Sequence, residues 1–273
     1  SLFERITAKE LDLRFEAAAG EELRLNTQHD AGFRVPIVYW PLSSQNVMVT
    51  EWVEATPISD IETMQQHHID TETMLSNLAS CFFSQAFRDG FFHGDMHPGN
   101  LLVDKAGNLI VVDFGIMGRL DHASRLYVAE IFRGFLKEDY LHVAKMHIRA
   151  GYVPAHVNAE EFAQASMAIT KPILDKPLED ISIGQLLGQL FMVTQQFEME
   201  TRPELLLLQK NLVLIEGVGR MLKPDANLWQ MAREPIEAWA KDTFSAKGRA
   251  KAIAAGRHEV MMEAKKTLHD VQL

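Results

Sequence analysis

The stretch from Phe92 to Gly115 constrains this chain more than any other part of its sequence. Asp95 is followed five residues later by Asn100, and the apolar run Leu109–Val112 ends at a second aspartate, Asp113. A phosphoryl-transfer site needs this order, because one carboxylate orients the acceptor while an amide and a second carboxylate hold Mg²⁺ on the nucleotide phosphates. The set therefore predicts Asp95 and Asn100 as catalytic residues, with Asn100 and Asp113 as metal ligands.

Each of these residues also has an ordinary structural interpretation. Asp95 alone would be a turn or N-cap aspartate, and Asn100 alone would be an Asx-turn cap. His93 and His97 flank Asp95 and raise the alternative of a zinc site. We disfavour zinc, because the Pro-Gly that follows excludes a helical ligand pair and no further His or Cys cluster completes a site. We expect His93 to brace the loop backbone through hydrogen bonds.

The composition excludes some classes of protein. The 273 residues are enough for one large domain or two small lobes around a substantial core. A formal charge of −10 argues against a nucleic-acid binder, which usually has a basic face. Cys81 is the single cysteine and precedes two phenylalanines, which predicts a buried, inert thiol in a reducing compartment. Neither a signal peptide nor a transmembrane span is visible in the sequence.

The N-terminal part of the chain reads as a partial small lobe. Lys9–Arg24 has the apolar spacing of a helix, with Gly20 as a weak point. Val35–Trp40 and Val47–Val53 are β-rich and predict a hairpin. Glu54–Asp60 has no periodic pattern, and we interpret it as the junction between two lobes.

We therefore divide the chain into a small lobe over residues 1–56 and a mostly helical large lobe over residues 57–273, an α+β architecture. The Gly-Val-Gly at 217–219 follows no strand, so we expect it in close helix packing rather than nucleotide binding. The elements predicted for the large lobe are a helix over Thr71–Arg88 capped by Gly90, a hairpin of Leu101–Val103 and Leu109–Asp113, and helices over His122–Leu136 and Tyr140–Ala150 capped by Asp121 and Asp139.

These motifs together resemble the UbiB family, also called ADCK proteins, which are atypical kinase-like proteins linked to ubiquinone biosynthesis. Glu10-Leu11-Asp12, leading into the helix with Glu16, resembles the family's acidic E-x-D element. On composition alone, these three acidic residues would be a solvated helix face. Thr50–Val53 resembles the hinge segment, and the stretches that contain Asp95, Asn100 and Asp113 resemble the family's catalytic and metal motifs.

The resemblance implies a protein-kinase-like fold with ATP and Mg²⁺ as cofactors. It implies that Asp95 is the catalytic-loop aspartate and that Asn100 and Asp113 hold the metal. Glu16 would pair with an ATP-contacting lysine, and Glu51 and Val53 would lie beside the adenine. That lysine and the nucleotide loop are absent, as are the C-terminal apolar helices of bacterial members. We interpret the chain as an internal fragment and expect it to be inactive alone.

The segment after Gly115 is too short for the peptide platform of ordinary protein kinases, because Asp121 already starts a helix. A small-molecule or lipid-related acceptor, or ATP hydrolysis coupled to lipid handling, is therefore favoured over protein phosphorylation. Two alternatives to a UbiB-type kinase or ATPase stay open. One is a soluble phosphotransferase similar to aminoglycoside or choline kinases, and the other is a non-catalytic lipid-binding pseudoenzyme.

The expected partners are a nucleotide, a lipid or quinone-precursor ligand, a membrane surface and other ubiquinone-biosynthesis proteins, with no nucleic acid. The last segment, from Lys241 to Leu273, has seven Lys or Arg residues against four Asp or Glu. It would suit an anionic membrane, although a solvated terminal helix explains it equally well. We expect the full-length protein to be cytoplasmic and peripheral to the bacterial inner membrane.

Overall fold

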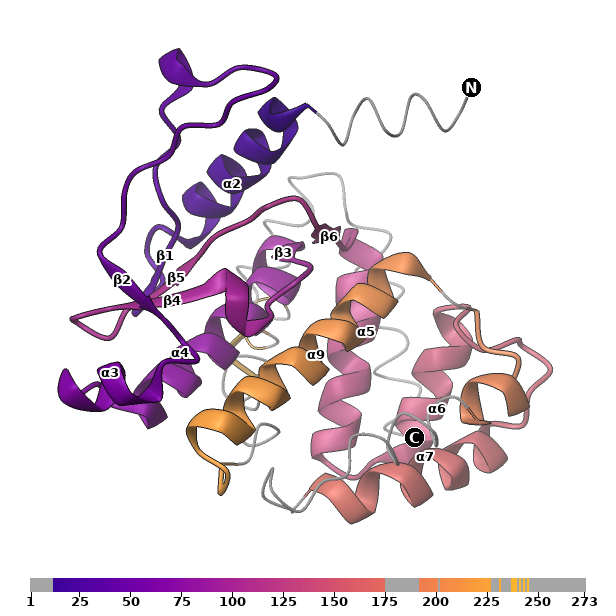
Figure 1. Cartoon of the computed structure of the whole chain (residues 1–273). Helices are drawn as coiled ribbons and strands as arrows, with labels where there is room; N and C mark the ends of the chain where they lie inside the picture. Colours follow the sequence, from indigo (N-terminus) through magenta and orange to yellow (C-terminus); the bar gives the residue numbers. More distant parts are fainter. Residues whose placement is uncertain are drawn as a thin grey trace.

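The computed structural model describes residues 12–174, 192–200, 202–226 and a few positions between 231 and 245. A small sheet with helix α2 above it adjoins a larger, mostly helical body (Figure 1). The elements, in chain order, are α2 (Leu13–Thr27), β1 (Phe33–Arg34), the 3₁₀ helix η1 (Trp40–Leu42), β2 (Ala55–Pro57), α3 (Ile61–Gln66), α4 (Thr71–Ser84), the π-helix η2 (Gln85–Asp89), β3 (Phe91–His93), the 3₁₀ helix η3 (Pro98–Asn100), β4 (Leu101–Asp104), β5 (Leu109–Val111), β6 (Met117–Arg119), α5 (His122–Leu136), α6 (Tyr140–Arg149), α7 (Ala159–Leu174) and α9 (Pro203–Leu222).

The larger sheet joins segments that are far apart in the chain. Its strand order is β1-β5-β4-β2. β4 pairs antiparallel with β5 and with β2, whereas β1 pairs with β5 in parallel. β3 and β6 form a separate antiparallel pair. The predicted hairpin of Leu101–Val103 and Leu109–Asp113 is confirmed as β4 and β5, although β5 ends two residues earlier.

The first predicted hairpin is wrong in its extent. Its two arms meet at one isolated bridge between Val38 and Thr50, and neither arm forms a regular strand. Pro36 removes a backbone donor from the first arm, and Pro41 follows the arm directly, which limits the ladder. The segment Glu54–Asp60, for which we predicted no regular structure, contains β2. This strand pairs antiparallel with β4, which lies far away in the sequence.

Local signals place the helices well. The helix that we predicted over Lys9–Arg24 is α2, which Asp12 caps and which extends to Thr27. Asp121 caps α5, whose bounds are those predicted, and Asp139 caps α6. Gly90 ends η2 in the left-handed conformation, with φ of +67°. It is a position for glycine alone, because a Cβ there would lie 2.6 Å from the carbonyl oxygen of Leu120.

The main core lies between the sheet, α4, α5 and α9. Phenylalanines dominate it: Phe82 packs edge-on against Phe92, and Phe83 packs edge-on against Phe132. Cys81 lies in this core, so the prediction of a buried cysteine is confirmed, and burial raises the pKa of its thiol. A smaller core joins α6 and α7.

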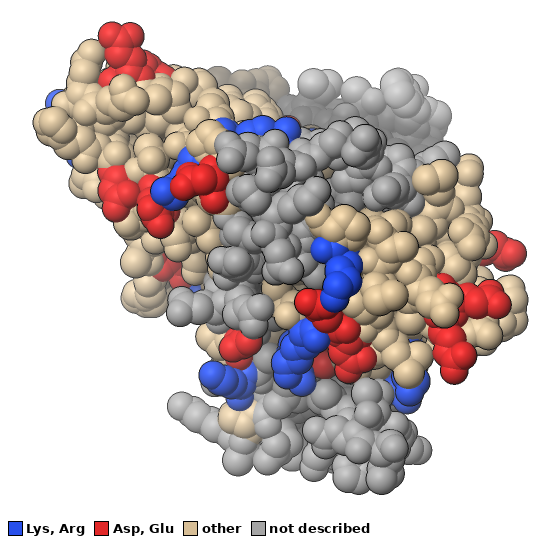
Figure 2. Space-filling view, turned by 90° about the horizontal axis from the view of Figure 1, so that it is seen from below, with Lys and Arg blue, Asp and Glu red and all other residues tan. Residues whose placement is uncertain are grey.

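Part of the sequence prediction lies outside the described residues, namely Glu10 and most of the basic C-terminal segment. Of the helices that the structure describes, none is both long and apolar enough to span a membrane. On the described part of the face in Figure 2, acidic and basic side chains lie close together.

Gly217 is exposed, and a Cβ there would meet nothing within 4 Å, so the prediction of close helix packing is wrong for this residue.

Candidate active site

The loop between β3 and β4 carries Asp95 and Asn100. The single turn η3 closes this loop, and His97 caps it by accepting a hydrogen bond from the backbone N–H of Gly99 (3.0 Å). Asn100 is buried and donates from Nδ2 to the carbonyl oxygen of Asp95 (3.0 Å). The two predicted catalytic residues are thus tied together, with the Asp95 carboxylate partly open to solvent at 23% exposure.

His93 braces the loop backbone, as the sequence predicted. Its Nδ1 accepts a hydrogen bond from the backbone N–H of Asp95 (3.1 Å), so the ring proton lies on Nε2, which donates to the carbonyl oxygen of Asp113. Burial lowers the pKa of His93 and favours this neutral form, partly offset by the bond to Asp113. One imidazole therefore joins the loop of Asp95 to the loop of Asp113.

A backbone hydrogen bond brings Asp113 beside Asn100. The N–H of Val112 donates to the carbonyl oxygen of Asn100 (3.0 Å), and Asp113 follows at once. Asp113 has a φ of +65°, a left-handed conformation that aspartate tolerates better than most residues. Its Oδ1 accepts from the N–H of Gly115 (3.0 Å), which fixes the carboxylate over the turn.

The donor set of Asn100 and Asp113 fits Mg²⁺. The structure shows no protein partner for Oδ1 of Asn100 or Oδ2 of Asp113 among the residues that it describes. Both are hard oxygen atoms, and Mg²⁺ is usually held by one or two such side chains together with substrate phosphates. Over the same described ranges, no cluster of three or more His, Cys, Asp or Glu side chains could hold a metal ion.

Helix α2 contacts the turn after Asp113 through two residues one helical turn apart. The Oε1 atom of Glu16 accepts a hydrogen bond from the backbone N–H of Phe114 (3.1 Å). Gly20 lies against the Phe114 ring, and a Cβ there would approach that ring to 2.7 Å. The glycine that looked like a weak point of the helix is therefore where α2 and this turn meet.

Asp12 and Glu51 are engaged with neighbouring residues. Asp12 accepts from the backbone N–H of Arg14 as the N-cap of α2, and hydrogen bonds from the Arg14 guanidinium lower the pKa of its carboxyl. Glu51 forms an ion pair with Arg34 and accepts from the N–H of Ile37 (3.3 Å). The Glu51 carboxylate is therefore already engaged within the protein.

The segment Thr50–Val53, which resembles the family's hinge, is partly open. Val53 is half-buried, whereas the side chain between it and Glu51, that of Trp52, is 88% exposed. The alternation agrees with an extended segment that turns one side chain inward and the next outward.

Two residues of α9, which sequence reasoning missed, contact the loop between β3 and β4 (residues 94–100, the motif loop). Lys210 places Nζ 2.6 Å from Oδ1 of Asp95. Asn211 is fully buried, accepts a hydrogen bond from the N–H of Met96 and donates to the carbonyl oxygen of His93. The signal was present, because these two polar residues interrupt a run of leucines, valine and isoleucine in α9.

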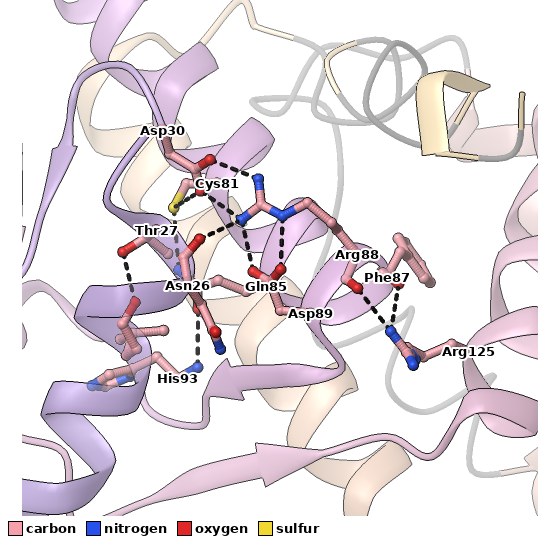
Figure 3. A network of polar contacts seen from close by, with 11 residues as sticks. Asn26, Thr27, Asp30, Cys81, Gln85, Phe87, Arg88, Asp89, His93 and Arg125 are labelled. Atoms are coloured by element: carbon pink, nitrogen blue, oxygen red, sulfur yellow. Dashed lines mark hydrogen bonds and ion pairs between the residues drawn. The ribbon is translucent and has the colours of Figure 1, made fainter. Parts of the chain in front are cut away.

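A polar network ties the end of α2 to the base of the same loop (Figure 3). The Arg88 guanidinium of η2 lies between Asp30, at 2.6 Å, and Asp89, at 2.7 Å. Gln85, in the same π-helix, accepts a hydrogen bond from the backbone N–H of His93 (3.1 Å). The π-helix thus contacts both the segment after α2 and the strand that leads into the loop, and π-helices occur frequently at functional sites.

Comparison with known proteins gives two family matches. The ABC1 atypical kinase-like domain matches residues 1–147, and the UbiB helical domain matches residues 167–227. The first match contains Glu16, Asp95, Asn100 and Asp113. The second contains Lys210 and Asn211.

Curated relatives agree with these matches. The chain is 41% identical over 249 residues to a protein of Pseudomonas putida named "Probable protein kinase UbiB", with 90% of this chain and 46% of the relative covered. A protein of the same name from Erwinia tasmaniensis is 41% identical over 244 residues, covering 88% of this chain and 45% of the relative. The chain thus spans about half the length of the curated relatives that it matches, and the resemblance to the UbiB family is confirmed.

A solved structure shows the same fold. The complex of Rv3197 with erythromycin from Mycobacterium tuberculosis matches with a TM-score of 0.61 at 21% identity, over 90% of this chain and 62% of that one. Together with the family match, this confirms the predicted α+β, kinase-like fold.

Proposed function

Because the chain belongs to the family of ABC1 atypical kinase-like domains, we propose that it carries the phosphoryl-transfer site of a UbiB-type kinase or ATPase that depends on Mg²⁺ and ATP and supports ubiquinone biosynthesis. Membership of the family shows a kinase-like domain. The cofactors, the reaction and the biosynthetic role are our proposal.

One observation supports the proposal most. Asn100 is bonded through its side chain to Asp95 and through its backbone to Val112, so the three predicted site residues converge although 18 residues separate the first from the last. Such convergence of an acceptor-side carboxylate with two oxygen ligands is what phosphoryl transfer requires.

The roles follow from where each side chain lies. Asp95 is partly open to solvent and would orient the acceptor hydroxyl or water and accept its proton. Asn100 and Asp113 would hold Mg²⁺, which when bound neutralises charge on the nucleotide phosphates. Glu16 would position the turn at Phe114, and Val53 would lie beside the adenine.

The connection from Asp113 to α5 supports a small or lipid-related acceptor. β6 follows only four residues after Asp113 and is paired with β3 along its whole length, and α5 begins at His122. A peptide substrate would need a long exposed segment here, as in ordinary protein kinases. We propose that a lipid or quinone-precursor ligand, presented at a membrane surface, occupies this side of the site.

The metal assignment is tested with Asp113→Asn in the full-length protein. We expect Mg·ATP affinity to fall by at least tenfold, which corresponds to about 1.4 kcal/mol, while thermal unfolding is unchanged. Asp60→Asn is a matched control, because it makes the same change at the cap of α3, where asparagine also caps well. Equal Mg·ATP affinity in Asp113→Asn and wild type would contradict the assignment.

A further inference from the structure

The motif loop is held from the far end of the sequence by two consecutive residues of α9. Lys210 reaches the Asp95 carboxylate and Asn211 reaches the loop backbone on either side of it. Both residues lie outside the motif that supplies Asp95, Asn100 and Asp113. The partner elements lie 115 residues or more apart.

Asn211 acts as a clamp on the backbone around Asp95. Its Oδ1 accepts from the N–H of Met96 (2.9 Å), immediately after Asp95. Its Nδ2 donates to the carbonyl oxygen of His93 (2.9 Å), two residues before Asp95, and to that of Leu207 in its own helix (3.0 Å). The amide thus uses its oxygen and both hydrogens, and its burial excludes water from competing for them.

Lys210 fixes the carboxylate itself. Its Nζ lies 2.6 Å from Oδ1, whereas Oδ2 faces His97, whose Nε2 is 3.9 Å away. Oδ1 is therefore held closely by Lys210, whereas Oδ2 has only the longer contact with His97, and the side chain as a whole is 23% exposed. The lysine side chain is 45% exposed, so the ion pair adds little to folding stability and its value lies in orientation.

We infer that Lys210 and Asn211 are positioning residues for the proposed acceptor-orienting carboxylate: Asn211 sets the loop backbone, and Lys210 turns Asp95 so that Oδ2 faces the acceptor. This inference rests on the proposed function. It also gives the helical domain that contains α9 a direct part in the site rather than a purely supporting one.

Lys210 is tested in the full-length protein by measuring ATP turnover and, separately, Mg·ATP affinity. We expect Lys210→Met to lower kcat by about 10- to 100-fold, since small misplacements of a reacting group cost this much. Mg·ATP affinity should stay within about twofold, because the lysine acts on the carboxylate. Lys210→Arg should retain more activity than Lys210→Met, since it keeps the cation.

A matched control lies next to it. Gln209→Met introduces the same side chain at the adjacent exposed position of α9 and should leave both quantities unchanged. Three results would overturn the inference: wild-type kcat in Lys210→Met, an arginine variant no better than the methionine variant, or a loss confined to Mg·ATP affinity. The last would mean that Lys210 contacts the nucleotide phosphates instead.

A double-mutant cycle asks whether Lys210 acts through Asp95. In an Asp95→Asn background, Lys210→Met should cause no further loss of kcat, whereas independent effects would multiply and contradict the inference. If Asp95→Asn has no detectable turnover, the arginine comparison and the affinity measurement decide.

The same experiments separate this inference from the proposed function. If wild type binds Mg·ATP and Asp113→Asn binds equally well, the proposed function fails at its metal site. If Asp113→Asn loses affinity but Lys210→Met behaves as wild type, the positioning inference fails alone.

Discussion

Glu16 accepts a hydrogen bond from the backbone N–H of Phe114, a residue 98 positions later in the chain. This contact fixes the start of α2 against the turn that follows Asp113. The family resemblance implies a second role for the same carboxylate, as partner of an ATP-contacting lysine, which we propose. The two roles require different properties of the side chain, an acceptor oxygen for the first and a charge for the second.

Two substitutions of Glu16 separate these roles. Glu16→Ala removes the acceptor and should lower the free energy of unfolding by about 0.5–1.5 kcal/mol, whereas Glu16→Gln keeps an oxygen and should lower it less. Both should weaken Mg·ATP binding in the full-length protein, because both remove the charge. Urea unfolding and nucleotide titration measure the two effects. Glu21→Gln, which loses only a local pair with Arg24, is the control, and equal unfolding of the Glu16 variants would argue against the hydrogen bond.

Gly20 of α2 and Gly217 of α9 should respond in opposite ways to the same substitution. Gly217→Ala should stabilise the protein by about 0.5–1 kcal/mol, because alanine is the better helix former and nothing lies near the new methyl group. Gly20→Ala gains the same propensity but pushes a methyl group into the Phe114 ring, and overpacking costs about 1–3 kcal/mol. We expect Gly20→Ala to be destabilised in thermal unfolding and to bind Mg·ATP less tightly. Stabilisation by both substitutions would show that Phe114 moves aside freely.

Local patterns predicted much of this molecule, because caps and periodicity act over a few residues. Asp121 and the apolar spacing after it located α5 at both ends. The three site residues lie within one short stretch, so their order alone indicated that they would converge. The bracing role of His93 followed from its place in a tight loop, and the structure confirms it.

Long-range pairings had no such local signal. β1 is two residues long and pairs with β5, 76 positions away at Phe33 and Leu109, so nothing near Phe33 reveals its partner. Sequence reasoning gave Lys210 no role, because its partner is set by how α9 packs across the motif loop. The local signal was that Lys210 and Asn211 interrupt the apolar run of α9, since an unpaired amide in an apolar core is costly.

We expect the free energy of unfolding to fall at acidic pH, partly because of His93. Burial lowers its pKa, whereas a histidine in the unfolded chain has a pKa of about 6.5. The unfolded state therefore binds more protons below this pH, so the contribution of His93 is complete above about pH 6.5 and is lost as the pH falls toward its folded pKa. His147 acts in the same direction, with burial lowering its pKa to about 4.

The measurement is the free energy of unfolding in urea between pH 7.5 and 5.5. We expect His93→Gln to show a smaller loss over this range than wild type, whatever its stability at pH 7.5. His147→Gln should also reduce the loss of unfolding free energy, and it measures how much His147, in α6, contributes to the pH dependence. An unchanged pH dependence in His93→Gln would mean that the ring is charged in the folded protein or that water reaches it.

Asn211 should be the most sensitive position of α9. Asn211→Leu leaves the N–H of Met96 and the carbonyl oxygen of His93 without their partner in a buried place, and each such group costs about 1–3 kcal/mol. Asn211→Asp keeps the shape and one acceptor, but it places a carboxylate against two carbonyl oxygens, those of His93 and Leu207, and loses both donors. We expect both variants to lose at least about 2 kcal/mol of unfolding free energy.

Gln209→Leu is the control, since surface substitutions usually change stability by less than about 0.5 kcal/mol. Urea unfolding followed by circular dichroism gives the three values on one scale. Turnover in the folded fraction then separates loss of fold from loss of loop position, because a clamp on both sides of Asp95 should lower kcat even where the protein remains folded. If Asn211→Leu and Gln209→Leu are equally stable and equally active, α9 does not hold the loop, and the contacts of Asn211 are incidental to the position of Asp95.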